Sequence, residues 1–210
     1  MTIQDKLDIV KRNVINAASV YSKQLAGRYY LYIFEGNCFE MYYGTDNFLH
    51  LTGAGTFLSP NQFYQLAKDG LLQSKQIRCS KRFPLSVAIK KSANLIDLDK
   101  FVREGYFVIK DLVTDTNTYP YAITNIDQSV LIGLKNEEEV EEIYIPKSFR
   151  IKGNVFNKAE SDNLFEIQMI LSKTDIEAKY NNILFQEKVK ISELPDFIQD
   201  KIDDGLKENE

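Results

Sequence analysis

The stretch RYYLYIFEGNCFEMYY, residues 28–43, forms the centre of the predicted fold. Residues 29–35 and 38–43 are rich in Tyr, Phe and Ile, as strands are, and Gly36-Asn37 fits a two-residue hairpin loop between them. Apolar side chains stand at odd and even positions alike, so both faces of the hairpin need cover. The sequence therefore predicts two neighbouring strands inside a covered sheet.

Helices are predicted on both sides of this hairpin. Thr2 begins a capping box, and apolar residues spaced three and four apart then predict a long amphipathic helix that ends at Gly27. A second capping box at Ser59, with proline in the next position, predicts a helix that stops at Gly70. A third helix is expected to start at Pro84.

The remaining chain has mainly strand composition, with polar turns that favour an antiparallel meander. The expected strands are residues 106–113, 121–126, 130–134, 143–151, 164–171 and 183–186. The predicted fold class is α+β: a mainly antiparallel twisted sheet packed against a long N-terminal helix and two or three further helices. We expect three segments: an N-terminal helix packing on the domain (1–27), the α+β domain (28–190) and an acidic C-terminal helix or tail (191–210).

Composition limits the class of protein. With 44% apolar residues the chain can bury a core, and no apolar run reaches the length of about 18 residues that a membrane span needs. Met1 is followed by a polar segment rather than a signal peptide. We therefore expect a cytoplasmic protein with no membrane contact.

Charge is distributed unevenly along the chain. Residues 1–135 carry 16 Lys and Arg against 12 Asp and Glu, a net charge of +4, whereas residues 136–210 carry 10 against 18, a net charge of −8. Between Lys68 and Lys91 seven basic residues face only Asp69. A basic surface of this kind attracts phosphate groups, although a solvated helix face is the simpler interpretation of the segment alone.

His50 is the only histidine and the best candidate for a functional centre. Phosphate-binding loops, dinucleotide fingerprints, paired metal ligands and serine-hydrolase elbows are missing from the sequence, so neither a metal site nor a cofactor is expected. Histidine titrates near neutrality and can accept and donate a proton in one turnover. A lone histidine is more often structural, but Thr52, Gly53 and Gly55 follow it and suit close approach to an anionic substrate.

The run Asn47-Phe48-Leu49-His50-Leu51-Thr52-Gly53, followed by Ser59 and Phe63-Tyr64, resembles the signature of a phage-associated branch of the Barnase–EndoU–colicin–RelE-like nuclease superfamily. Weaker similarity continues through residues 131–135, 144–149 and 170–173 with Tyr180, so that it covers roughly residues 28–188. The resemblance implies a helix-plus-sheet nuclease fold that usually acts on RNA without a metal, in mobile-element proteins, toxins and effectors.

This resemblance suggests roles for individual residues. His50 would be the general acid or base, and Thr52 and Ser148 would hydrogen-bond phosphate or orient the imidazole. Positive charge for the phosphate would come from four residues. These are Lys81, Arg82, Lys147 and Lys173. A second catalytic group is still needed, and a Lys with a depressed pKa, a Glu such as Glu40 or a Tyr would have to supply it.

Several alternatives stay open at the level of sequence. Thr52, Ser148 and Lys173 each have a structural interpretation, as turn cap, edge-strand hydroxyl and strand end. The tyrosines of residues 29–43 are expected in the core rather than in an exposed base-stacking platform. A different class of function is a non-catalytic binding protein that inhibits a host factor through the acidic half or sequesters a nucleotide or RNA. The first helix could also pack on a partner.

Overall fold

The computed structural model describes residues 1–208 apart from residues 82, 115–116, 138–139 and 152–162. The helices, in chain order, are α1 (Ile3–Gln24), α2 (Asn47–Thr52), α3 (Pro60–Lys68), η1 (Ser74–Gln76), α4 (Leu85–Asn94), η2 (Leu95–Val102), η4 (Ile191–Glu193), α5 (Asp196–Gln199) and α6 (Asp204–Lys207). The strands are β1 (Arg28–Phe34), β2 (Asn37–Tyr42), β3 (Gly55–Thr56), β4 (Ile77–Arg78), β5 (Phe107–Val113), β6 (Thr118–Thr124), β7 (Val130–Glu137), β8 (Val140–Ile151), β9 (Leu164–Glu166), β10 (Met169–Thr174) and β11 (Asn182–Gln186). The α+β prediction is confirmed.

The large sheet has the strand order β11-β10-β1-β2-β8-β7-β6-β5-β9. Every pair of neighbours in it is antiparallel except β2 and β8, which run parallel. The expected meander is therefore present as β5 to β8, and the prediction of a mainly antiparallel sheet is confirmed. Strands β3 and β4 form a separate two-stranded ribbon.

The hairpin between β1 and β2 turns one residue earlier than the sequence suggests. Phe34 pairs with Asn37, so the loop is Glu35-Gly36 rather than Gly36-Asn37. Both loop residues have positive φ, 46° and 69°, which is the geometry of the turn that matches strand twist. Asn37 instead stays in the strand and donates its side-chain amide to the Glu35 carbonyl at 3.1 Å. Cross-strand pairing, not local turn propensity, sets this register.

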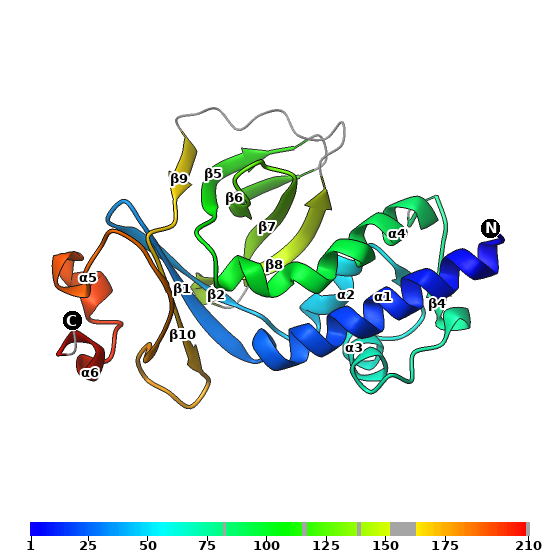
Figure 1. The fold of residues 1–210 in the computed structure, drawn as a ribbon, viewed down its shortest axis with the longest axis horizontal. Helices are drawn as coiled ribbons and strands as arrows, with labels where there is room; N and C mark the ends of the chain where they lie inside the picture. The colour runs from blue at the N-terminus through cyan, green and yellow to red at the C-terminus, as the bar shows by residue number, and fades with distance from the viewer. Residues whose placement is uncertain (82, 115–116, 138–139, 152–162, 209–210) are drawn as a thin grey trace.

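The segment predicted as one strand over residues 164–171 is broken in two. β9 pairs with β5, whereas β10 pairs with β1. Between them the Ile167 amide donates to the Tyr106 carbonyl and the Gln168 amide donates to the Ile33 carbonyl. The kinked segment thus connects the strand pair of β5 and β9 with that of β1 and β10, and in Figure 1 β9 lies above β1 and β10.

Side chains of β1 alternate between two cores. Tyr30, Tyr32 and Phe34 are fully buried in the larger core, which the helices α1 to α4 and η2 cover. Leu31 and Ile33 are fully buried in a second core on the other face. Most of the hairpin tyrosines are therefore core residues, as predicted, and the base-stacking alternative does not apply to them.

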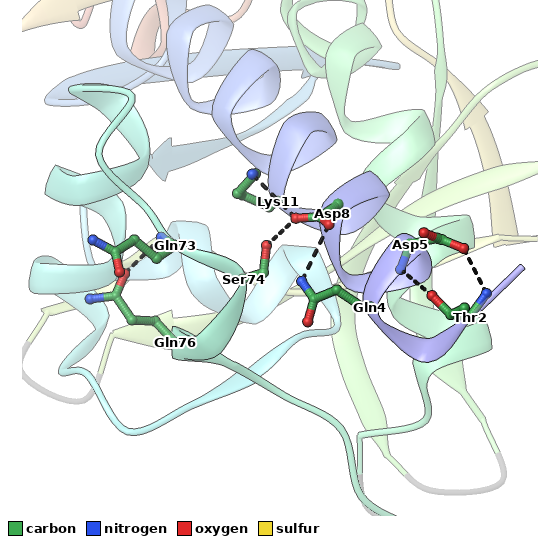
Figure 2. A network of polar contacts seen from close by, with 8 residues as sticks. All are labelled: Thr2, Gln4, Asp5, Asp8, Lys11, Gln73, Ser74 and Gln76. Atoms are coloured by element: carbon green, nitrogen blue, oxygen red, sulfur yellow. Dashed lines mark hydrogen bonds and ion pairs between the residues drawn. The ribbon is translucent and has the colours of Figure 1, made fainter.

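Helix α1 covers its own sheet rather than a partner, with α3, α4 and η2 packed along it (Figure 1). The predicted capping box is present: Thr2 and Asp5 exchange side-chain to backbone hydrogen bonds. Farther along, the Asp8 carboxylate accepts hydrogen bonds from Gln4, Lys11 and Ser74 (Figure 2). The Ser74 contact ties η1, and with it the start of β4, to α1.

The C-terminal segment covers the second core. Ile191, Ile198 and Ile202 are fully buried there beside β1 and β10, while α5 and α6 lie at the opposite end of the molecule from the N-terminus (Figure 1). An acidic segment thus packs through its apolar side chains. The division of the chain into segments 1–27, 28–190 and 191–210 stays a prediction.

Glu40 fixes this segment to the sheet. Its carboxylate accepts hydrogen bonds from the Tyr180 hydroxyl at 2.7 Å and the Lys201 ammonium at 2.6 Å. Burial alone would raise the pKa of Glu40, but the contacts with Lys201 and Tyr180 outweigh it and the pKa is lowered. Glu40 is therefore ionised at neutral pH.

Replacing Glu40 by Gln removes this charge and is expected to lower the free energy of unfolding by about 1–3 kcal/mol at pH 7. Because the folded pKa is lowered, the contribution is present above the unfolded value near 4.3 and is lost as pH falls through the folded pKa. Urea unfolding at pH 7 and pH 3 measures the difference. Glu187→Gln, which breaks an exposed pair with Lys188, serves as the control. An equal loss at both pH values would contradict the assignment.

Candidate functional site

Helix α2 begins where β2 ends and is fixed from its buried side. Its inward residues include Phe48, whose ring packs against Tyr21 of α1 at 5.1 Å and Tyr64 of α3 at 5.6 Å between centroids. The buried side chain of Asn47 accepts a hydrogen bond from the Gly44 amide at 2.9 Å. The Gly44 carbonyl in turn accepts one from the Tyr21 hydroxyl at 2.7 Å. These contacts fix the outward face of the short helix.

His50 stands on this outward face and is exposed. Protein atoms nonetheless remove part of the hydration of the imidazole, and this desolvation lowers the pKa of His50 below its ordinary value of about 6.5. Repulsion from the nearby Lys147 ammonium acts in the same direction, while Asp46 opposes it. The imidazole is therefore mostly neutral at pH 7 and available to accept a proton.

Lys147 reaches this neighbourhood because of a β-bulge in β8. Gly133 of β7 pairs with Ser148, but the next residue, Leu134, pairs with Pro146, so Lys147 is an extra residue in the ladder. Tyr144 and Phe149 are five residues apart and would point to opposite faces of a regular strand. The bulge lets both pack in the helix-covered core. It also exposes Lys147 near His50.

The sheet opens at this place. β2 and β8 are paired only at Glu40 with Ile143 and at Met41 with Tyr144. α2 packs against β8 beyond the end of β2. On the side of β8 away from β7 there is no neighbouring strand among the described residues beyond Tyr144, so β8 can tolerate Pro146, which lacks an amide donor. Helix and bulge thus meet where two strands diverge.

Lys91 of α4 lies at the C-terminal end of α2. A Cβ atom on Gly53 would stand 2.8 Å from the Lys91 Cδ, so the lysine stem packs directly on this glycine, three residues along the chain from His50. Burial, helped by repulsion from the Arg150 guanidinium, lowers the pKa of Lys91 to about 8. Lys91 is thus a second group that titrates near neutrality, of the kind the sequence left unassigned.

Thr52 is turned into the protein interior, and Ser148, which is half-buried, lies on the other face of the sheet. Thr52 is fully buried, and its hydroxyl donates to the Leu49 carbonyl at 2.8 Å and accepts from the Ala54 amide at 3.1 Å. Ser148 pairs with Gly133, whose neighbours Ile132 and Leu134 lie in the helix-covered core. Strand alternation therefore places Ser148 on the opposite face from Lys147.

The remaining predicted residues are more widely separated. Lys81 is exposed in a turn that precedes α4. Arg82 lies outside the described residues. Lys173 lies on the face of the second core, with its ammonium 4.8 Å from the Tyr180 ring centroid, so the structure does not bring it to His50. Glu40 is on that face too, engaged by Lys201 and Tyr180.

Sequence reasoning counted Lys91 only as part of a basic segment. Its helical position was readable from the sequence, because Pro84 marks the helix start. The burial that lowers its pKa depends on α4 packing against Gly53, a contact between residues far apart in the chain. Local patterns carry no signal for such a contact.

We expect Thr52→Val to destabilise the protein, because it leaves the buried Ala54 amide and Leu49 carbonyl without their hydroxyl partner. The free energy of unfolding should fall by about 1–3 kcal/mol in urea titrations. Thr52→Ser keeps the hydroxyl and should recover most of the loss. A valine variant as stable as the wild type would refute this account.

Metal-binding groups and membrane-spanning helices can be assessed in the described part of the chain. No group of three or more His, Cys, Asp and Glu side chains there could hold a metal ion. No helix there is long and apolar enough to cross a membrane.

Comparison with known proteins identifies one family. The comparisons with curated proteins and with solved structures find no match. The family model described as phage-Barnase-EndoU-ColicinE5/D-RelE like nuclease4 matches residues 13–189, which include α2, the β8 bulge and α4. This match confirms the resemblance drawn from the motif around His50, extends it into α1, and supports a nuclease-like role with nucleic acid as substrate. The chain therefore belongs to the phage-Barnase-EndoU-ColicinE5/D-RelE like nuclease4 family.

Proposed function

We propose that this protein is an endoribonuclease that cleaves RNA without a metal, with His50 as its general base. The observation that carries the proposal is the pairing of an exposed imidazole of lowered pKa with the Lys147 ammonium beside it. A neutral imidazole can take the proton of a ribose 2′-hydroxyl, whose oxygen then attacks the adjacent phosphate. The bond from phosphorus to the 5′-oxygen of the next nucleotide breaks, which leaves a 2′,3′-cyclic phosphate, and the departing 5′-oxygen takes a proton from the imidazolium or from water. Family membership supports a nuclease or effector role, and in the proposal the protein acts in a host cytosol as a toxin or effector of phage or mobile-element origin.

Lys147 has the position and charge to stabilise the transition state. Negative charge builds on the phosphate oxygens during attack, and a fixed cation next to that phosphate stabilises it. The bulge exposes Lys147 close enough to His50 to repel its charged form, and in the proposal a phosphate bound at the ammonium is presented to the imidazole. In the proposal Lys147 thus stabilises the charge and His50 transfers the proton.

Lys91 supplies the second titrating group of the proposed site. With a pKa of about 8 it is mainly protonated at pH 7, whereas His50 is mainly neutral. Two groups whose environments hold them in opposite protonation states suit a reaction that needs a base and a cation together. In the proposal Lys91 acts in its charged form, on the substrate phosphates at the end of α2.

The proposal is tested by incubating labelled total RNA with purified protein in EDTA. Wild type should cleave it, and His50→Ala should reduce the rate by roughly 10²–10⁴-fold. Lys147→Met should reduce it by roughly a hundredfold. Lys23→Met removes an exposed lysine at the end of α1 and should leave the rate unchanged.

Retention of the wild-type rate by His50→Ala would refute the assignment of the base. No cleavage by the wild-type protein on any RNA would favour the binding protein instead. Its acidic residues 136–210 would then be the place to look for a host partner, by pull-down with and without the C-terminal segment.

The pH dependence gives an independent test. The rate should rise with pH as His50 loses its proton, with a midpoint below about 6.5. It should fall again as Lys91 loses its proton near pH 8. Lys91→Arg keeps the positive charge to much higher pH, so this variant should lose the alkaline limb and keep the acid limb. An alkaline limb that stays near pH 8 in Lys91→Arg would exclude Lys91 as its source.

A further inference from the structure

Two phenylalanines on the small β3–β4 ribbon are exposed. Phe57, directly after β3, is 67% exposed, and Phe83, in the turn after β4, is 37% exposed. A single exposed aromatic side chain is ordinary, but aromatic side chains that lie together on one small element indicate a binding surface. The guanidinium of Arg78 lies over the Phe57 ring. An aromatic face and a cation are thus presented together.

The ribbon is continuous with the His50 site. A Cβ on Gly55 would stand 2.8 Å from the Phe83 ring, so this ring packs on the loop that follows α2. Two residues earlier in the same loop, Gly53 carries the Lys91 stem. The surface therefore extends from His50 over the glycine loop to Phe83, and across the strand pair of Gly55 with Arg78 to Phe57.

The charge of this surface is positive and uncompensated. Arg78, Lys81 and Lys90 are all exposed, and no ion pair between described residues includes them. Asp69 is the only acidic residue in the segment from 68 to 91. Nearby acidic residues do not cancel the positive electrostatic field of this surface. The surface therefore favours a polyanion over a protein partner with few acidic residues.

The ribbon is also held in place before any ligand binds. The Thr56 hydroxyl donates to the Gln76 carbonyl at 2.8 Å, and the Gln73 amide donates to the Gln76 side chain at 2.8 Å. The Ser74 hydroxyl donates to Asp8 of α1 (Figure 2). A fixed aromatic surface loses little conformational entropy when a ligand stacks on it.

The geometry points to a binding surface for single-stranded RNA, formed by Phe57, Arg78, Lys81 and Phe83. Unpaired bases stack on the two rings while the cations contact the phosphates, and the strand continues over the glycine loop to His50. This inference rests on the proposed ribonuclease function. It adds that the substrate is unpaired RNA, because a duplex keeps its base faces stacked internally and cannot offer them to the rings.

The test uses the full-length protein and an end-labelled 2′-O-methyl oligoadenylate, which lacks the hydroxyl needed for cleavage. Fluorescence anisotropy should show tighter binding of this strand than of its duplex with 2′-O-methyl oligouridylate. Phe57→Ala with Phe83→Ala should weaken single-strand binding by roughly tenfold or more. Arg78→Met should reduce the slope of log affinity against log salt by about 0.7.

Phe197→Ala is the matched control, because this phenylalanine is 54% exposed on α5, in the C-terminal segment. Its affinity for the oligonucleotide should equal that of the wild type. Phe83→Ala could disturb the packing on Gly55, and a lower unfolding temperature of that variant would reveal this. The affinity of Phe57→Ala alone for the single strand then serves as the test. Equal binding of single strand and duplex, or wild-type affinity in Phe57→Ala and the double variant, would overturn the inference.

The outcomes also separate this inference from the proposed function. Phe57-dependent binding by a protein that cleaves no RNA would uphold the surface and refute the ribonuclease. His50-dependent cleavage with no loss of binding in the phenylalanine variants would uphold the ribonuclease and refute the surface.

Discussion

Strand β1 is buried on both of its faces, and the rest of the molecule is arranged to meet that requirement. Tyr30, Tyr32 and Phe34 need cover from α1 to α4, while Leu31 and Ile33 need cover from the C-terminal segment. Each fully buried side chain of this size contributes about 1.5–3 kcal/mol through removal from water. A hairpin alone could not bury them, which is why both ends of the chain return to the same strand.

The location of the candidate site follows from how the β1–β2 hairpin meets the meander. β2 accompanies β8 for only a short distance, and α2 then takes its place beside β8. Helix ends, glycines and a β-bulge come together at this opening, where the backbone is not part of regular strand pairing. Here the side chains of His50 and Lys147 can be exposed while the backbone that carries them packs on the core.

The sequence predicted well those features that depend on neighbouring residues. The capping boxes at Thr2 and Ser59, the stop at Gly70 and the helix after Pro84 are all present because each is satisfied within one or two turns of chain. Features that depend on distant segments were missed or displaced. The break at Ile167-Gln168 arises because two separate strands compete for that segment, and no local pattern encodes it.

The site itself was predictable only in part, for the same reason. His50 could be singled out as the only histidine, but the approach of Lys147 requires a bulge whose cause is the odd spacing of Tyr144 and Phe149. Lys173 was grouped with the site because of its charge, whereas strand alternation places it on the other face. Sidedness in a sheet depends on register, and register between distant strands is not a local property.

The kinked segment from β9 to β10 also has a consequence for the making of the protein. β1 ends at Phe34, yet the strand that completes its ladder begins only at Met169. Until that strand has been synthesised, the nascent chain presents an aromatic strand with an unpaired edge, a state prone to association with other chains. A product that stops before Met169 keeps this edge of β1 exposed.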